Sequence, residues 1–345
     1  MPPDQQAASP EPAEGAAAAR RPRLTPPIAD VRRAVRSVLP AEGLVLVALS
    51  GGADSLALAA ATAFEAPRAG LRAGAVIVDH GLQDASADVA SAAADAARAL
   101  GLDPVLVRRV EVDRAGEGGP EASARSARYA ALDAAAAQTG AALVLLGHTL
   151  DDQAETVLLG LARGSGTASL AGMPARAGRY ARPLLGIRRA TTRRACLDAG
   201  LEPWHDPHNL DPAYARVRVR ERVLPMLETE LGPGIAEALV RTAEQLREDD
   251  EAFTAQIDEF IEEICEPSEA GIAVSAGALA ANPAALRQRI IRHVVASEFG
   301  VSLTRAQTLE VARLVTDWHG QGPIELPSGI RAGRAAGRIV FSATG

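Results

Sequence analysis

Four short aliphatic runs alternate with Ala-rich segments of helical length, and this alternation limits the folds that the chain can adopt. Each run has the length of a buried strand. The predicted strands are Leu44 to Leu49, Ala75 to Asp79, Val105 to Val112 and Leu143 to Gly147. The predicted helices between them are Asp54 to Phe64, Ser86 to Leu100 and Glu121 to Gln138. Repeated strand–helix–strand units form parallel sheets with helices on both faces, so we expect a doubly wound α/β fold.

The length of 345 residues allows two domains, at roughly 150 residues per domain. Residues 1–24 are rich in Ala, Pro and Glu and are predicted to be a disordered tail. Residues 25–225 then hold the α/β domain, and residues 226–266 an acidic linker that is helical from about Glu228 to Glu263. Residues 267–345 are predicted to form a smaller α+β domain. Its expected helices are Pro283 to Phe299 and Thr304 to His319, and its expected strands are Ile324 to Leu326 and a hairpin within Ile330 to Phe341.

Every basic side chain is an arginine, because none of the 36 Lys and Arg residues is a lysine. This excludes a Walker A loop, a Schiff-base lysine and a nucleotidyl-lysine intermediate, each of which needs an amine. The two cysteines, Cys196 and Cys265, argue against a disulfide framework and a four-cysteine zinc site. No apolar stretch reaches the ~18 residues of a membrane span, and no apolar leader stands at the N-terminus. We therefore expect a cytoplasmic protein that does not enter a membrane.

A glycine-rich loop follows the first predicted strand and directly precedes a helix. Its residues are Ser50, Gly51, Gly52, Ala53, Asp54 and Ser55. Two glycines let a backbone approach a phosphate closely, and the two hydroxyls and the helix N-terminus add hydrogen-bond donors. Because a carboxylate repels bare phosphates, Asp54 suggests a Mg²⁺ ion between it and the phosphate oxygens. The competing interpretation is a simple capped strand-to-helix turn.

Two other predicted strands also end in polar residues. Val78, Asp79 and His80 end the second strand, where an adenosine would rest against the Val78 backbone. An Asx-type turn is the alternative for Asp79 and His80.

Acidic residues follow the fourth strand. His148 is followed by a segment with Asp151, Asp152, Glu155 and Thr156, in which the last three share one helical face. Helix initiation by Thr149 and Asp152 is the alternative, but the acids outnumber what a cap requires. Such a group can coordinate Mg²⁺, bind an ammonium group or remove its proton.

Four sequence blocks in register carry a family resemblance. The loop from Ser50 to Ser55 resembles the PP-loop of N-type ATP pyrophosphatases, and the other blocks follow in that family's order. These blocks are Val78 to Leu82, Glu121 to Tyr129 and Gly147 to Thr156. With Arg163 to Gly166, Arg182 to Leu185, Asp206 to Asn209 and Arg216 to Pro225, the chain resembles the tRNA(Ile)-lysidine synthetase branch. The resemblance is close over residues 40–230 and loose over the last ~80.

The resemblance implies a reaction and roles for its residues. The family activates the wobble cytidine of a CAU-anticodon isoleucine tRNA with ATP and joins free lysine to it, releasing AMP and pyrophosphate. Adenylation of the C2 oxygen creates a leaving group that the lysine ε-amine displaces. We expect ATP to contact the loop, Val78, His80 and Arg125, and Mg²⁺ to contact Asp54 and Asp152. The expected catalytic residues are Asp54, Arg128, His148, Asp152 and Glu155, with Glu155 assigned to lysine and Asp152 to a share of both the lysine and the Mg²⁺ role.

Residues 176–222 form an arginine-rich segment with eleven arginines and five acids, a net charge of +6 in a chain of net charge −7. Such a segment predicts contacts with tRNA phosphates, and Trp204, Tyr214 and His208 could stack on unpaired bases. The predicted phosphate contacts are Arg193, Arg194, Arg216, Arg218 and Arg220. The alternative is a solvated surface. The alternation of arginine and valine over residues 216–220 allows an extended or a helical segment.

The sequence therefore predicts an ATP-dependent RNA-modifying ligase with a small C-terminal tRNA-binding domain. Its expected partners are the isoleucine tRNA and free lysine, and a homodimer is a further association to consider. One rival is a PP-loop thiolase acting on tRNA, which needs sulfur-transferring cysteines. Another is an adenine-nucleotide-binding module without catalysis, which would keep the loop but would not need Asp152 and Glu155.

Overall fold

The computed structural model describes residues 24–81, 86–110, 119–164, 166–206, 211–268 and 271–343. Several predictions fall outside these residues: the tail up to residue 23, Leu82, Val112, Ser165, and the segment Pro207 to Asn209 with His208. The side chain of Glu121 is also outside the described set. The chain divides into two compact units, one made of Met1–Asp151 and Ala175–Asp211, the other of Asp152–Pro174 and Pro212–Gly345. The domain boundaries expected at residues 225 and 266 stay a prediction.

The first unit contains a six-stranded sheet in the order β3-β2-β1-β4-β6-β5. All neighbours pair in parallel except β5 and β6. The strands are β1 (Leu44–Ala48), β2 (Arg72–Asp79), β3 (Val105–Arg109), β4 (Leu143–Leu145), β5 (Arg176–Ala177) and β6 (Tyr180–Ala181). From β1 the chain builds outward to β3 and then returns to place β4 on the other side of β1. This reversal is the switch point at which open parallel sheets bind ligands.

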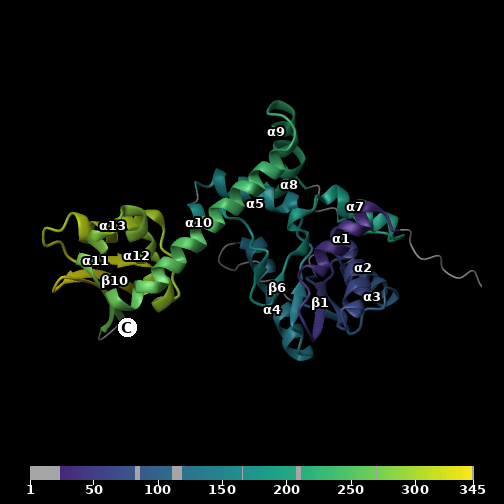
Figure 1. Cartoon of the computed structure of the whole chain (residues 1–345), viewed down its shortest axis with the longest axis horizontal. Coiled ribbons are helices and arrows are strands. Elements are labelled where there is room, and N and C mark those ends of the chain that lie inside the picture. The colour runs from purple at the N-terminus through teal and green to yellow at the C-terminus, as the bar shows by residue number, and fades with distance from the viewer. Residues whose placement is uncertain are drawn as a thin grey trace, which may run out of the picture. The chain divides into compact units, whose positions relative to one another are not determined.

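Both faces of this sheet are covered, which confirms the predicted doubly wound fold. Val45 and Val47 of β1 pack with one set of helices, whereas Leu44 and Leu46 face the other side. Alternate residues of one strand point to opposite faces, so a strand buried on both sides is aliphatic throughout. The first set is α1 (Pro26–Arg36), α2 (Ala53–Arg68), α3 (Ser86–Ala99) and α7 (Arg189–Asp198), and the other face carries α4 (Gly119–Thr139) (Figure 1).

The second unit joins helices to a five-stranded antiparallel sheet in the order β7-β8-β11-β10-β9. Its helices include α5 (Leu150–Ala162, from Asp152 onward), α6 (Thr167–Leu170), α8 (Ala215–Arg218), a π-helical turn (Val219–Val223), α9 (Leu224–Glu230) and the long α10 (Ile235–Ile264) (Figure 1). The strands are β7 (Cys265–Ser268), β8 (Gly271–Ser275), β9 (Ile324–Leu326), β10 (Ile330–Ala335) and β11 (Arg338–Ala343). The helices α11 (Ala276–Ala281), α12 (Ala284–Phe299) and α13 (Arg305–Thr316) share one core with this sheet. The predicted α+β domain is confirmed.

The structure contains elements that were not predicted from the sequence. These are the helices α1, α6, α7, α9 and α11 and the strands β5 to β8. The hairpin expected within Ile330 to Phe341 is two strands joined by a turn at residues 336–337. In the described part of the chain, every helix is too short or too polar to span a bilayer.

Candidate active site

The glycine-rich loop closes on itself through Ser55. The Ser50 N–H donates to Ser55 Oγ at 3.2 Å, and that hydroxyl donates to the Gly52 carbonyl at 2.9 Å. Gly51 has a φ of +84°, which favours glycine because a Cβ is strained there. The loop thus leads from β1 into the first turn of α2 at the switch point of the sheet, where a helix N-terminus can meet phosphates.

Two neighbouring segments hold this loop. A Cβ on Gly147, which follows β4, would lie 3.3 Å from the Ser55 backbone nitrogen, so the close approach favours glycine. The Trp204 N–H donates to the Gly51 carbonyl at 3.0 Å. The backbone of Trp204 therefore supports the phosphate loop, a role that the sequence did not indicate; its stacking on bases stays a prediction.

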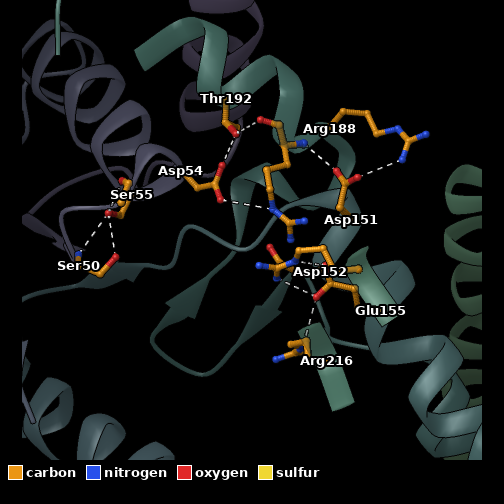
Figure 2. Close-up of polar contacts among 12 residues, drawn as sticks. Ser50, Asp54, Ser55, Asp151, Asp152, Glu155, Arg188, Thr192 and Arg216 are labelled. Carbon is orange, nitrogen blue, oxygen red and sulfur yellow. Dashed lines mark hydrogen bonds and ion pairs between the residues drawn. The ribbon is translucent and has the colours of Figure 1, made fainter. Parts of the chain in front are cut away.

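Asp54 lies in the first turn of α2 and contacts α7 (Figure 2). Its carboxylate accepts a hydrogen bond from the Thr192 hydroxyl, and Arg189 Nε lies 3.8 Å from its other oxygen. The Thr192 side chain is buried, whereas that of Asp54 is 26% exposed. The Asp54 carboxylate is therefore oriented by the buried Thr192 hydroxyl and remains partly exposed to solvent.

Asp151 fixes the start of α7 (Figure 2). It accepts from the Arg189 backbone N–H at 2.7 Å and from Arg188 Nη1 at 3.1 Å. A carboxylate at a helix N-terminus satisfies an N–H without an intrahelical partner and favours the positive end of the dipole. Asp151 thus has a structural role at the start of α7, which explains one of the acidic residues that follow the fourth predicted strand.

Asp79 is buried at the end of β2 and accepts from the Gly81 N–H at 3.0 Å. Burial alone would raise the pKa of this carboxyl, but the hydrogen bonds from Gly81 and Ser86 and the nearby Arg109 charge bring its pKa below the ordinary value. The bond from Gly81 is that of an Asx turn, the alternative interpretation for Asp79. Val78 is half-buried and His80 exposed, and their contact with an adenosine stays a prediction.

Asp152 and Glu155 lie in the second unit and are paired with arginines (Figure 2). Glu155 is fully buried and accepts from Arg220 Nε at 2.8 Å and Nη2 at 3.0 Å. Arg216 Nε lies 3.4 Å from Glu155, and Arg220 Nη2 lies 3.4 Å from Asp152. A buried carboxylate needs such partners because an isolated buried charge is very costly.

The arginines of residues 216–220 are helical, which settles the choice that the sequence left open. Arg216 and Arg220 are four residues apart and both reach Glu155, as side chains one turn apart do on a helix. Arg218 instead donates to the carbonyls of Pro212 and Ala213, each at 2.7 Å. Val217 and Val219 are both buried.

The other predicted site residues are distributed over the first unit. Arg193 and Arg194 are exposed on α7, and Arg194 pairs with Asp198 at 2.7 Å. His148 is half-buried after β4. Arg125 and Arg128 lie on α4 beside Tyr129. Arg182, which follows β6, also contacts Tyr129. The Tyr129 and Arg182 side chains were not assigned a role from the sequence, although both stand in blocks of the family resemblance.

The donor set around Asp54 is compatible with magnesium. Among the described residues no three His, Cys, Asp or Glu side chains gather as a metal site. Mg²⁺ often uses only one or two carboxylates and completes its shell with waters and substrate phosphates. The oriented, partly exposed Asp54 beside a phosphate-type loop supplies one such carboxylate.

The parallel sheet and the glycine-rich loop at its switch point define a nucleotide-binding α/β protein of the PP-loop class. Two family profiles match the chain, the PP-loop domain over residues 29–227 and the TilS substrate binding domain over residues 275–340. A tRNA(Ile)-lysidine synthase of Leifsonia xyli subsp. xyli is 65% identical over 299 residues, which cover 86% of this chain and 89% of the relative. One of Thermobifida fusca is 53% identical and covers 92% of this chain and 98% of the relative. The chain belongs to the tRNA(Ile)-lysidine synthase family.

A solved structure shares the fold of the chain. The U34-tRNA thiolase NcsA from Methanococcus maripaludis, with its [4Fe-4S] cluster, aligns with a TM-score of 0.54 at 22% identity. The alignment covers 64% of this chain and 79% of that chain. This likeness concerns the fold alone.

Proposed function

We propose that the chain is an ATP-dependent ligase that joins L-lysine to C2 of the wobble cytidine of the CAU-anticodon isoleucine tRNA. Family membership at 65% identity over most of the chain is the observation that carries this function. The oriented phosphate loop and the carboxylates of Asp152 and Glu155 are the parts that such a reaction needs. The products besides the modified tRNA are AMP and pyrophosphate.

The adenylation half of the reaction is assigned to the first unit. The loop from Ser50 to Ser55 binds the ATP phosphates with backbone N–H groups and hydroxyls. Asp54 holds Mg²⁺, which when bound neutralises charge on the phosphates. Thr192 keeps the Asp54 carboxylate turned to that side, and Arg125 and Arg128 supply positive charge for the adenylyl group.

The lysine half of the reaction is assigned to Asp152 and Glu155. Glu155 is fully buried and held by two N–H groups of Arg220, whereas the Asp152 side chain is 15% exposed and lies at the longer distance of 3.4 Å. In this arrangement Asp152 meets the ammonium group of lysine. Glu155 can bind that cation only if Arg220 gives up one of its two hydrogen bonds to Glu155. Lysine and Arg220 therefore compete for the same carboxylate.

A tRNA substrate fits the distribution of basic residues. Arg193 and Arg194 are exposed, and Arg194 reaches a phosphate by leaving its ion pair with Asp198; the small C-terminal domain matches the substrate-binding profile. Arg216 and Arg220 serve the carboxylates directly and reach RNA only when these pairs rearrange. We place the reaction in the cytoplasm, where tRNA, ATP and lysine occur together, and a homodimer remains part of the proposal.

The thiolase alternative is not favoured by the thiols of the chain. Burial and the charge of Asp54 raise the pKa of Cys196 to about 11, and burial raises the pKa of Cys265 to about 11. Both are therefore protonated at neutral pH, whereas sulfur transfer needs thiolates.

The proposed function is tested by incubating the full chain with the isoleucine tRNA transcript, ATP and labelled lysine. We expect lysine incorporation with one AMP and one pyrophosphate released per lysine. A transcript with uridine at the wobble position is the matched control and should accept none. A double variant Cys196→Ala, Cys265→Ala should retain incorporation; AMP release that depends on sulfide instead of lysine would contradict the proposal.

A further inference from the structure

Three arginines surround the hydroxyl of Tyr129 in the first unit. Arg182 Nη2 donates to Tyr129 Oη at 3.2 Å, and Arg125 Nη2 donates to the same oxygen at 3.4 Å. The guanidinium carbon of Arg128 lies 5.7 Å from the centre of the Tyr129 ring. Arg125, Arg128 and Tyr129 belong to α4, whereas Arg182 directly follows β6.

The ring of Tyr129 is held independently of its hydroxyl. It contacts the Tyr180 ring edge to face, with centroids 5.1 Å apart and an interplanar angle of 74°. The Tyr180 hydroxyl donates to Asp133 at 2.8 Å and lies 3.4 Å from the Tyr129 backbone carbonyl, so it does not bond the Tyr129 hydroxyl. Arg125 also lies over the Tyr129 ring, 5.0 Å from its centre. Loss of the Tyr129 hydroxyl alone would therefore leave these ring contacts in place.

The positive charges of Arg125 and Arg128 are not balanced locally. Within the described part of the chain, no carboxylate forms an ion pair with either of them, and the charged groups that act on Arg128 are Arg125, Arg182 and Tyr129. Burial lowers the pKa of Arg128, and its buried Nε has no hydrogen-bond partner among the described residues. Arg128 is the desolvated member of this cluster, and a buried guanidinium beside like charges is unfavourable unless an anion joins it.

The hydrogen of the Tyr129 hydroxyl indicates where that anion lies. Its oxygen already accepts from two guanidinium groups, which uses the acceptor capacity of a phenol. Among the residues that the structure describes, the hydroxyl hydrogen has no acceptor. Because its oxygen faces cations, this O–H is suited to donate to a negatively charged oxygen between them.

Arg182 brings the cluster to the ligand-binding edge of the sheet. The Leu146 N–H donates to the Ala181 carbonyl at 2.9 Å, so the residue after β6 stands beside the carboxyl end of β4. That edge carries the glycine-rich loop and Gly147. Ligand phosphates bind outside the carboxyl ends of parallel strands.

We propose that the Tyr129 hydroxyl, together with Arg125, Arg128 and Arg182, forms a subsite for a phosphoryl oxygen, with Tyr129 a direct hydrogen-bond donor. The inference rests on the proposed function for the choice of anion, which belongs to the nucleotide or to the tRNA backbone. Tyr129 and Arg182 are thereby added to the residues that bind phosphate. The Tyr129 oxygen also accepts from Arg125 and Arg182 and so holds their two guanidinium groups at fixed positions.

The test is Tyr129→Phe in the full chain, with binding of ATP, pyrophosphate and unmodified tRNA measured separately by calorimetry. If the anion belongs to the nucleotide, we expect about a tenfold weaker affinity for ATP or pyrophosphate and unchanged affinity for tRNA. If it is an RNA phosphate, tRNA affinity falls, its salt dependence becomes shallower, and nucleotide affinity is kept. Equal affinities for all three ligands in variant and parent would overturn the proposal.

Tyr180→Phe is the matched control, because it removes a neighbouring hydroxyl that donates to Asp133. We expect it to bind all three ligands as the parent does; an equal loss in both variants would reduce the role of Tyr129 to packing and refute the subsite. Arg125→Gln, at an exposed position, provides a second variant should Tyr129→Phe fold poorly, and it should shift the same affinity in the same direction. These binding measurements need no lysine transfer, so they can fail or succeed independently of the proposed reaction.

Discussion

Thr192 on α7 donates its hydroxyl hydrogen to the carboxylate of Asp54 on α2. The same hydroxyl lies 2.9 Å from the Arg189 carbonyl, but a charged acceptor makes the stronger bond. The pair links the phosphate loop to a helix far along the chain from it. The orientation of the Asp54 side chain therefore depends on the packing of α7 as well as on the loop itself.

Replacing Thr192 by valine should slow adenylation. Valine keeps the buried shape and removes the donor to Asp54, which costs about 1.5–3 kcal/mol for a bond to a charged group. We expect ATP–pyrophosphate exchange to fall roughly 10- to 100-fold. Thr192→Ser should restore most of the rate, and Thr191→Val on the same helix should leave it unchanged. A full rate in Thr192→Val would show that Asp54 needs no orientation from α7.

The two carboxylates of α5 should have separable effects on the two half-reactions. With Glu155 assigned to lysine and Asp152 to both lysine and Mg²⁺, Glu155→Gln should still form adenylated tRNA from labelled ATP and then accumulate it, with a raised apparent lysine requirement. Asp152→Asn should slow both half-reactions. If Glu155→Gln does not accumulate the labelled adenylate, Glu155 serves adenylation instead and its assignment to lysine is wrong.

Removing Arg220 should destabilise the second unit. Arg220→Ala leaves the fully buried Glu155 without its bidentate partner, which costs about 3 kcal/mol for a broken buried pair. The double variant Arg220→Ala, Glu155→Gln should recover part of that loss because it removes the buried charge. Urea unfolding of the parent, the single and the double variant measures both effects. A double variant no more stable than the single one would speak against an uncompensated charge.

Neutralising Arg193 and Arg194 should weaken tRNA binding and flatten its salt dependence. Each lost phosphate contact should reduce the slope of log affinity against log salt by about 1. Binding is measured from low to physiological salt with Arg193→Gln, Arg194→Gln and the double variant. Arg98→Gln, an exposed arginine of α3, is the control. An unchanged slope in the double variant would identify this face as merely solvated.

The contribution of Asp79 to the stability of the first unit should be lost at acid pH. The folded pKa of Asp79 lies below the ordinary value of 3.8, so its ionised form favours folding above that value. This contribution is lost as pH falls through the folded pKa. Asp79→Asn should therefore lower Tm at pH 6, and the difference from the parent should shrink as pH falls toward 2. A constant difference over this range would contradict the expectation.

The fold and the phosphate loop could be predicted because their signals are local. β1, the loop and the start of α2 are contiguous, and both faces of the strands are buried, so the aliphatic runs are continuous. The C-terminal strand β7 was missed since Cys265–Ser268 contains proline and polar residues at the edge of its sheet. Helix α7 was missed because its apolar content is low and its arginines resemble a surface segment.

The partners of the carboxylates could not be predicted, because the pairs are distant in sequence. Thr192 and Asp54 are 138 residues apart, and Arg220 and Glu155 are 65 apart. The excess of positive charge in residues 176–222 indicated a surface for RNA. Net charge alone cannot show that Arg216 and Arg220 form ion pairs with the buried Glu155. Only the packing of α8 and the following turn against α5 brings them together.

The π-helical turn at Val219–Val223 has a consequence for how this site tolerates changes in length. A π-turn holds one more residue than an α-turn, so it absorbs one extra residue within the turn itself. Deleting Glu221 or Arg222 would let the turn close as ordinary α-helix, and Arg216, Arg220 and α9 would stay close to their places. A deletion within α9 would instead rotate everything beyond it by about 100° around the helix axis. Val219–Val223 is thus the place where this segment would most readily accept the loss of one residue.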